Sequence, residues 1–165
     1  KSEPLQPGYC RVVLRGHHYG SYVTAPNTGF GITYALPVVI DGLAAAAGSM
    51  LIVENPEAHL HPKAQSNIGF FLGMMAAAGV KVVVETHSEH VVNGVRRALL
   101  YSDKISHDDL SICFFPEQPL PSGELFTHIT MDRFGNLSDF PVDFFDQVRQ
   151  DMREIMRLAK QNYEA

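Results

Sequence analysis

Residues 50–62 read Met-Leu-Ile-Val-Glu-Asn-Pro-Glu-Ala-His-Leu-His-Pro, and the rest of the fold can be worked out from them. The stretch begins as a short, uninterrupted apolar run, which is the pattern of a strand covered on both faces of a parallel sheet. Polar residues follow at once, and proline at 62 suits the first position of a helix, where no N–H is needed. We therefore predict a strand over 50–53 and a helix over 63–78 that Gly79 ends.

The same order of elements is repeated immediately downstream. Residues 80–88 read Val-Lys-Val-Val-Val-Glu-Thr-His-Ser, which predicts a second buried strand over 80–84. An amphipathic stretch over 89–101 then predicts a helix. Strand, helix, strand and helix at this spacing are typical of βαβ units and a parallel sheet.

The upstream part of the chain predicts a hairpin and a helix. Residues 1–8 contain two prolines and a glycine, which indicates a loose lead-in. Val- and Tyr-rich runs over 9–15 and 21–24 predict a pair of strands. A glycine turn over 27–31 then precedes an alanine-rich helix over 32–47.

The downstream part predicts a small antiparallel element and a last helix. Runs over 110–115 and 125–131 predict two strands, and 132–136 reads as a turn. Pro141 is expected to open a helix that carries Phe144, Phe145, Val148, Met152, Ile155, Met156 and Ala159 on one stripe. That spacing predicts an amphipathic helix docked on the rest of the protein.

The length and composition fit one α/β domain. The chain has 165 residues, of which 45% are hydrophobic and 19% charged. We expect a single domain over 1–165, made of a lead-in and hairpin (1–26), a central part (27–101) and C-terminal strands and helix (102–165). The fold class predicted is α/β, with a parallel β-sheet core, flanking helices, a small antiparallel edge and a C-terminal amphipathic helix.

Charge and cysteine content exclude several classes of function. The formal net charge is −5, so the chain lacks the strongly basic character of a nucleic-acid-binding domain. No apolar run is long enough to span a bilayer, and no signal peptide opens the chain, so no membrane partner is expected. The two cysteines, at 10 and 113, read as buried thiols in a reducing cytoplasm.

Three polar clusters are candidates for chemistry. Glu54 follows a buried strand, and α/β sheets bind their ligands at the carboxyl ends of such strands. Its carboxylate is an oxygen ligand of the kind that Mg²⁺ prefers. The structural alternative is that Glu54 caps the next helix. His87 follows the other strand and is expected at the same edge, although a single such histidine is often structural. The glycine turn 27–31 would present backbone N–H groups to an anion such as phosphate.

Together these motifs resemble the C-terminal half of ABC-type ATPase domains, a branch of the P-loop NTPases. The likeness covers most of residues 25–150 and is closest to bacterial AAA-family ATPases related to the overcoming-lysogenisation-defect nucleases and the chromosome-maintenance ATPases. The string from Glu54 to Pro62, together with Thr86-His87-Ser88, is specific for this group.

The resemblance implies a role for each motif. Glu54 matches the Walker B acid, which holds Mg²⁺ through water, and His87 matches the switch histidine, which senses the γ-phosphate. Residues 59–62, with His59 and His61, match the D-loop region, which lines a dimer interface. Asn27, Gly29 and Gly31 match the signature turn, which binds the nucleotide held by the opposite subunit.

Two departures from the family pattern affect catalysis. Asn55 occupies the position of the usual catalytic glutamate and cannot take a proton from water at neutral pH. Hydrolysis is then slow, or another acid such as Glu57 or Glu85 helps. The chain also lacks any G-x-x-x-x-G-K-[ST] phosphate-binding loop, so ATP and Mg²⁺ would both need residues from outside it.

The resemblance therefore implies a part of a larger ATPase. We expect the chain to be the C-terminal portion of a head that is completed by an N-terminal Walker A half and dimerises around ATP. Nucleic acid would be reached only through the parent protein, in DNA repair, chromosome handling or phage defence. The isolated chain is expected to bind ATP weakly and to be inactive as an ATPase.

Three other functions compete with the ATPase interpretation. A zinc hydrolase could draw its ligands from the histidines and acids at 54, 57, 59, 61, 87 and 90, but the spacing is not that of the zincins. A non-catalytic interaction module with an ATPase-like fold agrees with Asn55 and with the missing phosphate loop. An intrinsic nuclease is disfavoured because Asp108, Asp109 and Asp132 are scattered.

Overall fold

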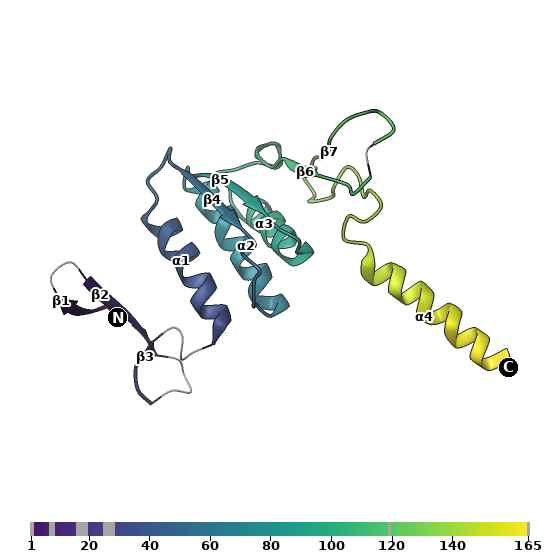
Figure 1. Ribbon diagram of the computed structural model, residues 1–165. Coiled ribbons are helices and arrows are strands. Elements are labelled where there is room, and N and C mark those ends of the chain that lie inside the picture. The colour runs from purple at the N-terminus through teal and green to yellow at the C-terminus, as the bar shows by residue number, and fades with distance from the viewer. Residues whose placement is uncertain (1, 7–8, 16–19, 25–28, 119, 165) are drawn as a thin grey trace. The chain divides into compact units, whose positions relative to one another are not determined.

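The structure is a computed structural model that describes residues 2–6, 9–15, 20–24, 29–118 and 120–164. The chain divides into two compact units, residues 1–104 and 105–165 (Figure 1). The prediction that residues 1–165 form a single domain stays a prediction.

The N-terminal unit begins with an antiparallel sheet in the order β1-β2-β3. Its strands are β1 (Ser2–Gln6), β2 (Tyr9–Leu14) and β3 (Val23–Thr24), and the pairing of β2 with β3 confirms the predicted hairpin. The hairpin tip, 16–19, lies outside the described residues. The lead-in prediction was wrong, because residues 2–6 form a strand. A proline is tolerated on this edge strand, where the register shifts between Pro4 and Gln6.

Helix α1 (Phe30–Ala44) follows the glycine turn. It begins two residues earlier and ends three residues earlier than predicted, and it continues through Pro37. Gly29 precedes the helix with a φ of 114°, a conformation that favours glycine. Gly31 therefore belongs to the first turn of the helix and not to the loop before it.

The centre of the unit is a parallel pair of strands, which confirms the predicted βαβ arrangement. Strands β4 (Met50–Glu54) and β5 (Lys81–Glu85) pair residue for residue, from Met50 opposite Lys81 to Glu54 opposite Glu85. Helix α2 (Pro62–Ala77) connects them, with proline in its first turn as predicted. Helix α3 (Glu89–Tyr101) follows β5 over the predicted residues.

Helices α2 and α3 lie unusually close together. A Cβ placed on Gly69 would come within 2.1 Å of the carbonyl oxygen of Val91, and a Cβ on Gly94 within 2.1 Å of the carbonyl oxygen of Ser66. Glycine at these two positions lets the two backbones touch. The buried core of the unit gathers around this contact and includes Val53, Ile68, Leu72, Val80, Val91, Ala98 and Leu99.

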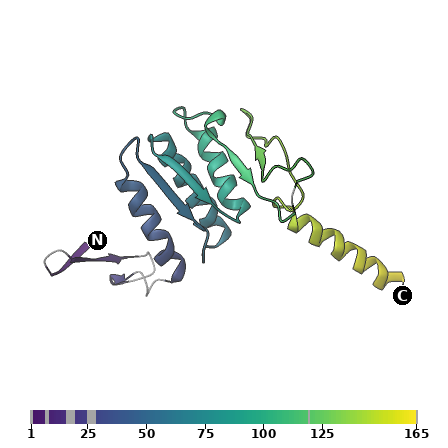
Figure 2. The same cartoon turned by 45° about the horizontal axis from the view of Figure 1, so that its top comes forward.

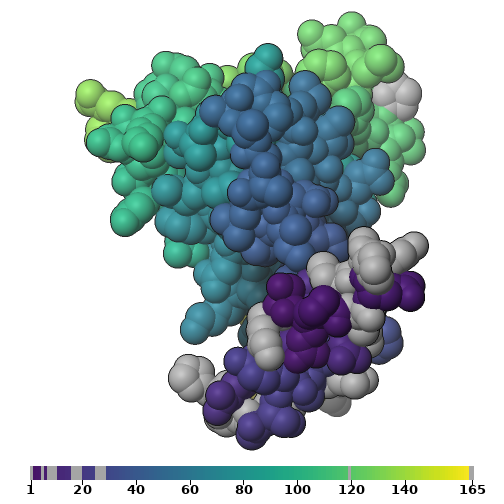
Figure 3. Space-filling model, turned by 90° about the vertical axis from the view of Figure 1, so that its left-hand side faces the viewer, coloured from purple at the N-terminus to yellow at the C-terminus, as the bar shows by residue number. Residues whose placement is uncertain are grey.

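One face of the β4–β5 pair is bare, so the prediction of strands covered on both faces was wrong. Met50, Ile52 and Val83 point to this face, and each is more than half exposed. Val53 is buried on the other face of the pair. Helix α2 packs against β5, and helix α1 packs against β4 (Figure 2). The apolar runs predicted a parallel sheet with strands covered on both faces, and the described residues contribute two parallel strands to it. Helix α1 is also open to solvent on its outer side (Figure 3).

The second unit contains a short antiparallel pair. After a 3₁₀ helix, η2 (His107–Asp109), strands β6 (Ile112–Phe114) and β7 (Thr127–Ile129) pair in a sheet of their own. This confirms their predicted antiparallel pairing. The side chain of Cys113 is exposed, which corrects the prediction of a buried thiol at this position.

The last helix begins later than predicted, and its apolar stripe is exposed. Helix α4 (Gln147–Glu164) begins six residues after Pro141, and Phe144 is buried in the turn that precedes it. Asp143 and Phe145 have positive φ values of 69° and 54°, which a helix cannot contain. Val148, Met152, Ile155 and Met156 do share one stripe, and all are exposed, so the described residues of the second unit do not cover it. Docking of this helix on the rest of the protein stays a prediction.

Candidate functional site

The carboxyl ends of β4 and β5 bring two acids side by side. Glu54 and Glu85 are the last register pair of the two strands, and both are exposed. The ladder continues one step further, because the Asn55 N–H donates to the carbonyl of Glu85 at 3.0 Å. Among the described residues, the Glu54 carboxylate has no hydrogen-bond or ion-pair partner.

The loop after β4 has an unusual backbone at two positions. Asn55 and His59 have φ values of 48° and 59°, in the left-handed region. Asparagine and histidine both occur in this region several times more often than most other non-glycine residues. The Ala58 N–H donates to the Asn55 carbonyl at 3.0 Å, and the Leu60 N–H to the Glu57 carbonyl at 2.9 Å. These two bonds fold residues 55–60 into a tight loop.

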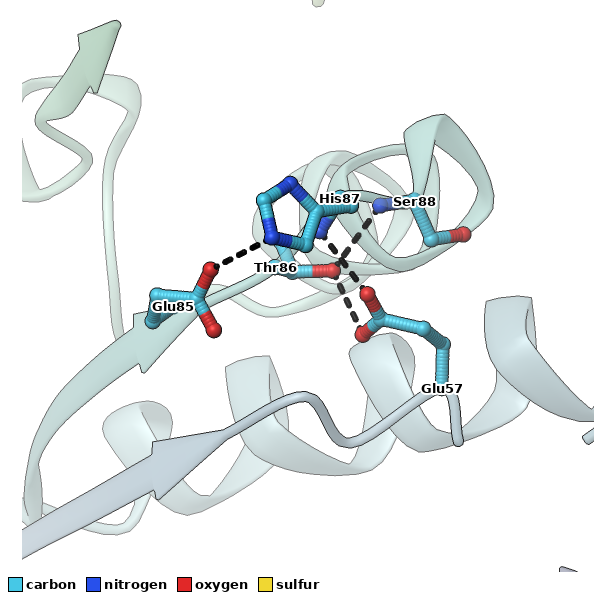
Figure 4. Close-up of polar contacts among 5 residues, drawn as sticks. All are labelled: Glu57, Glu85, Thr86, His87 and Ser88. Atoms are coloured by element: carbon cyan, nitrogen blue, oxygen red, sulfur yellow. Dashed lines mark hydrogen bonds and ion pairs between the residues drawn. The ribbon is translucent and has the colours of Figure 1, made fainter. Parts of the chain in front are cut away.

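Glu57 joins this loop to the loop after β5 (Figure 4). The Thr86 hydroxyl donates to Glu57 Oε2 at 2.7 Å, and the backbone N–H of His87 donates to Oε1 at 2.8 Å. Each carboxylate oxygen therefore accepts one hydrogen bond from the loop that carries His87. Bonds to an ionised acceptor are stronger than those between neutral groups.

A second tie runs through Ser88 and Gln65. Ser88 is buried and caps α3, where its hydroxyl oxygen accepts from the N–H groups of His90 and Val91 at 3.1 and 3.3 Å. The same hydroxyl donates to Gln65 Oε1 at 2.6 Å. The Gln65 amide in turn donates to the Leu60 carbonyl at 2.8 Å. The two loops are thus connected through Glu57 and, at the end of the 55–60 segment, through Gln65 and Leu60.

The His87 imidazole projects into solvent from this edge. Its side chain is 83% exposed, and Nε2 lies 3.2 Å from Glu85 Oε1 (Figure 4). The parallel pairing places Glu54, the last residue of β4, and the loop that carries His87 at the same end of adjacent strands. This geometry agrees with the expected neighbourhood, while the individual roles stay predictions.

The start of α1 packs against the same loop. The His59 ring lies 4.9 Å from the Tyr34 ring and 5.8 Å from the Phe30 ring, measured between centroids. A Cβ on Gly31 would come within 2.7 Å of the His59 carbonyl oxygen. The residue at 31 must therefore be glycine if this contact is to persist, and that packing reason is independent of any nucleotide.

The other predicted site residues are less closely connected. Asn27 lies outside the described residues, so the predicted signature turn is seen only from Gly29 onward. His61 is exposed and precedes α2, where its side chain makes no capping bond. The sequence pattern did not predict that Gln65, Thr86 and Ser88 connect the two loops through hydrogen bonds. Serine before Glu89 was a readable capping signal, but nothing in the pattern pointed to Gln65.

The described part of the chain offers no ligand set for a zinc enzyme. Within the described residues, no group of three or more His, Cys, Asp or Glu side chains could hold a metal ion. The zinc hydrolase alternative therefore has no coordinating cluster in this part of the chain. As for membranes, none of the helices described is both long and apolar enough to cross one.

Comparison with known proteins supports a P-loop type of fold. A family model described as "AAA domain, putative AbiEii toxin, Type IV TA system" matches residues 5–93, more than half of the chain. A second family, of proteins of unknown function (DUF3696), matches residues 105–155. Neither the curated proteins nor the solved structures contain a match. The match over β1–α3, where the βαβ unit and its polar edge lie, shows that the chain belongs to this family of AAA domains.

Proposed function

We propose that this chain forms part of an ABC-type ATPase head that binds ATP between two heads. The observation that carries the proposal is the register of β4 and β5, which sets Glu54 beside Glu85 and the loop of His87 at the same edge. Ligands of α/β sheets bind at the carboxyl ends of the strands. Membership of an AAA family, whose domains handle nucleotides, supports the same assignment.

In this proposal Glu54 holds Mg²⁺ through water. The Glu54 carboxylate fits this ion, because it is exposed and has no protein partner among the described residues. Mg²⁺ keeps several of its waters and binds proteins through one or two carboxylates. The ion would supply charge neutralisation at the phosphates. His87 would sense the γ-phosphate, because its exposed ring projects from the neighbouring strand end.

Residues on α1 and in the 55–61 loop are proposed to face the second head. The turn with Asn27, Gly29 and Gly31 would bind the nucleotide of the opposite subunit, and His59 and His61 would line the interface. Support comes from the packing of α1 on the loop through His59 and Gly31, which holds the two proposed interface segments together. The partner in this proposal is a second copy of the same head.

The phosphate-binding loop would come from an N-terminal Walker A half outside this chain. The sequence has no loop of that kind, and the bare apolar face of β4 and β5 is a surface that further strands or helices would cover. Burying exposed apolar side chains contributes roughly 25 cal/mol per Å² of area removed from water. Ile52, 65% exposed, and Val83 are central to that face.

Hydrolysis is proposed to be slow, because Asn55 stands where an acid would accept the proton. We assign no nucleic-acid contact to α3: Arg96 donates to Asn93 at 2.6 Å, and Arg97 donates to Ser66 at 2.8 Å. Nucleic acid would then be handled elsewhere in the parent protein.

The test is complementation. The chain is mixed with the phosphate-binding half, and ATP turnover is measured against the chain alone, the half alone, and the mixture with Glu54→Gln. Turnover that needs both parts and Glu54 supports the proposal. A complex that forms without binding ATP would instead favour the second candidate, a non-catalytic interaction module, which Asn55 and the absent loop also suit.

A further inference from the structure

Glu57 has two candidate roles, and its contacts distinguish them. An acid that takes a proton from water needs an oxygen turned toward that water. Both Glu57 oxygens instead accept hydrogen bonds from the loop after β5, at 2.7 Å from the Thr86 hydroxyl and 2.8 Å from the His87 N–H. Figure 4 shows the carboxylate directed at this loop.

The hydrogen bonds of Glu57 are linked to the N-terminus of helix α3. The Thr86 hydroxyl that donates to Glu57 also accepts from the Ser88 N–H at 3.1 Å, and Ser88 is the buried cap of α3. Gln65 holds Ser88 from the other side and reaches back to Leu60. The segment 86–88 is therefore fixed between α3 and the 55–60 loop.

The result is a fixed backbone that carries an exposed ring. The His87 N–H is held by Glu57, while its imidazole is 83% exposed and has Nε2 3.2 Å from Glu85 Oε1. A ring mounted in this way can turn toward a ligand without reordering of the backbone. Catalytic groups that are positioned in advance gain rate because less order is lost during the reaction.

We propose that Glu57 is a positioning residue, whose carboxylate fixes the backbone at His87 and takes no proton itself. The proposal rests on the proposed function for its consequence, the sensing of a phosphate by His87. Its physical part, the clamp between the two loops, concerns this chain alone. That part can be tested without any nucleotide.

The variants are Glu57→Gln and Glu57→Ala, with Glu117→Ala as a control that removes an exposed acid from the other unit. Glutamine keeps an oxygen for the His87 N–H and offers an N–H to the Thr86 oxygen, so it can preserve the clamp. Alanine removes both bonds. If Glu57 were instead the proton acceptor, both variants would remove that function equally.

The first readout is hydrogen exchange of the His87 amide in the 165-residue chain. We expect slow exchange in the wild type, Glu57→Gln and the control, and exchange at least about tenfold faster in Glu57→Ala, because protection reports local order. Equal protection in all four proteins would overturn the clamp. This result stands whether or not the chain ever binds ATP.

The second readout is ATP turnover by the complemented head. We expect kcat to fall about tenfold to a hundredfold in Glu57→Ala, with KM little changed, and to stay within about threefold in Glu57→Gln, because misplacement by an ångström costs rate. Equal losses in the two variants would make Glu57 a proton acceptor and contradict the proposal. A wild-type mixture without turnover would refute the proposed function, and the exchange measurement would then decide the clamp.

Discussion

Glu54 and Glu85 face each other across the last register pair of two parallel strands, both exposed and both acidic. Like charges directly opposite in a sheet destabilise it, unless a cation or a donor lies between them. Glu85 has such a neighbour in His87 Nε2, at 3.2 Å, whereas Glu54 has none among the described residues. The pair is therefore a source of local charge repulsion in the sheet, which a bound cation would relieve under the proposed function.

This arrangement predicts opposite effects of Glu54→Gln on stability and on function. Removing one of two adjacent charges should raise the free energy of unfolding of the chain by about 0.2–1 kcal/mol. The same change should abolish Mg²⁺-dependent ATP turnover in the complemented head. Urea denaturation and a turnover assay measure the two effects. Glu54→Gln that lowers stability would show a structural role for the carboxylate.

Asn55→Glu should trade stability for activity. At a φ of 48° asparagine is tolerated, whereas a glutamate costs about 1–2 kcal/mol more in the left-handed region. The new acid would, however, stand at the position of the family's proton acceptor. We expect a lower urea midpoint and a higher turnover rate in the complemented head.

Asn55→Gly is the matched control, because glycine suits the backbone but supplies no acid. It should keep or raise the stability and leave turnover at the wild-type level. If Asn55→Glu is no less stable than Asn55→Gly, the backbone explanation for asparagine at 55 is wrong.

The contact between α2 and α3 predicts that a glycine-to-alanine substitution, which usually stabilises a helix, will destabilise this chain. In an exposed helix, glycine to alanine gains up to about 1 kcal/mol. In Gly94→Ala the new Cβ would meet the Ser66 carbonyl oxygen at 2.1 Å, so the helices must move apart. Overpacking of a core costs typically about 1–3 kcal/mol, and contact with backbone leaves little room to relax.

Gly42→Ala serves as the comparison for Gly94→Ala. Its Cβ would meet the Phe71 ring at 2.8 Å, and a side chain can yield where a backbone cannot. Thermal unfolding should therefore rank wild type, Gly42→Ala and Gly94→Ala in order of falling stability. Equal melting temperatures for the last two would contradict the close helix contact.

Asp132 predicts a pH effect in the second unit. The Asn136 side chain, its backbone N–H and the N–H groups of Phe134 and Gly135 donate to the carboxylate and lower the pKa of Asp132 below 3.8. The turn is therefore stabilised at pH values above 3.8, and this contribution is lost as the pH falls through the folded pKa. Asn136→Ala should raise the pKa of Asp132 in an NMR titration. An unchanged midpoint would show that the backbone donors suffice.

The central elements could be predicted because strong local signals bound them. Pro62 opens α2, Gly79 follows its end with a φ of 91°, and Ser88 caps α3. These signals act within a few residues, and the structure follows them closely. The parallel pairing of β4 and β5 followed from the helix between them.

What could not be predicted depends on contacts distant in sequence. The apolar runs at 50–53 and 80–84 indicated burial, but periodicity cannot say whether the covering element belongs to the same chain. The stripe on α4 has the same ambiguity, and its residues are exposed. The clamp could not be predicted from the sequence, because Glu57 and Gln65 contact residues 86–88 only in the folded chain.

The most direct test of the account is a titration of Mg²⁺-ATP into the chain, alone and with the phosphate-binding half. The account predicts no tight, saturable binding by the chain alone at millimolar nucleotide. With the half present, it predicts saturable binding that requires Mg²⁺ and is lost in Glu54→Gln. Tight binding by the chain alone, or binding by the mixture that does not depend on Glu54, would contradict it.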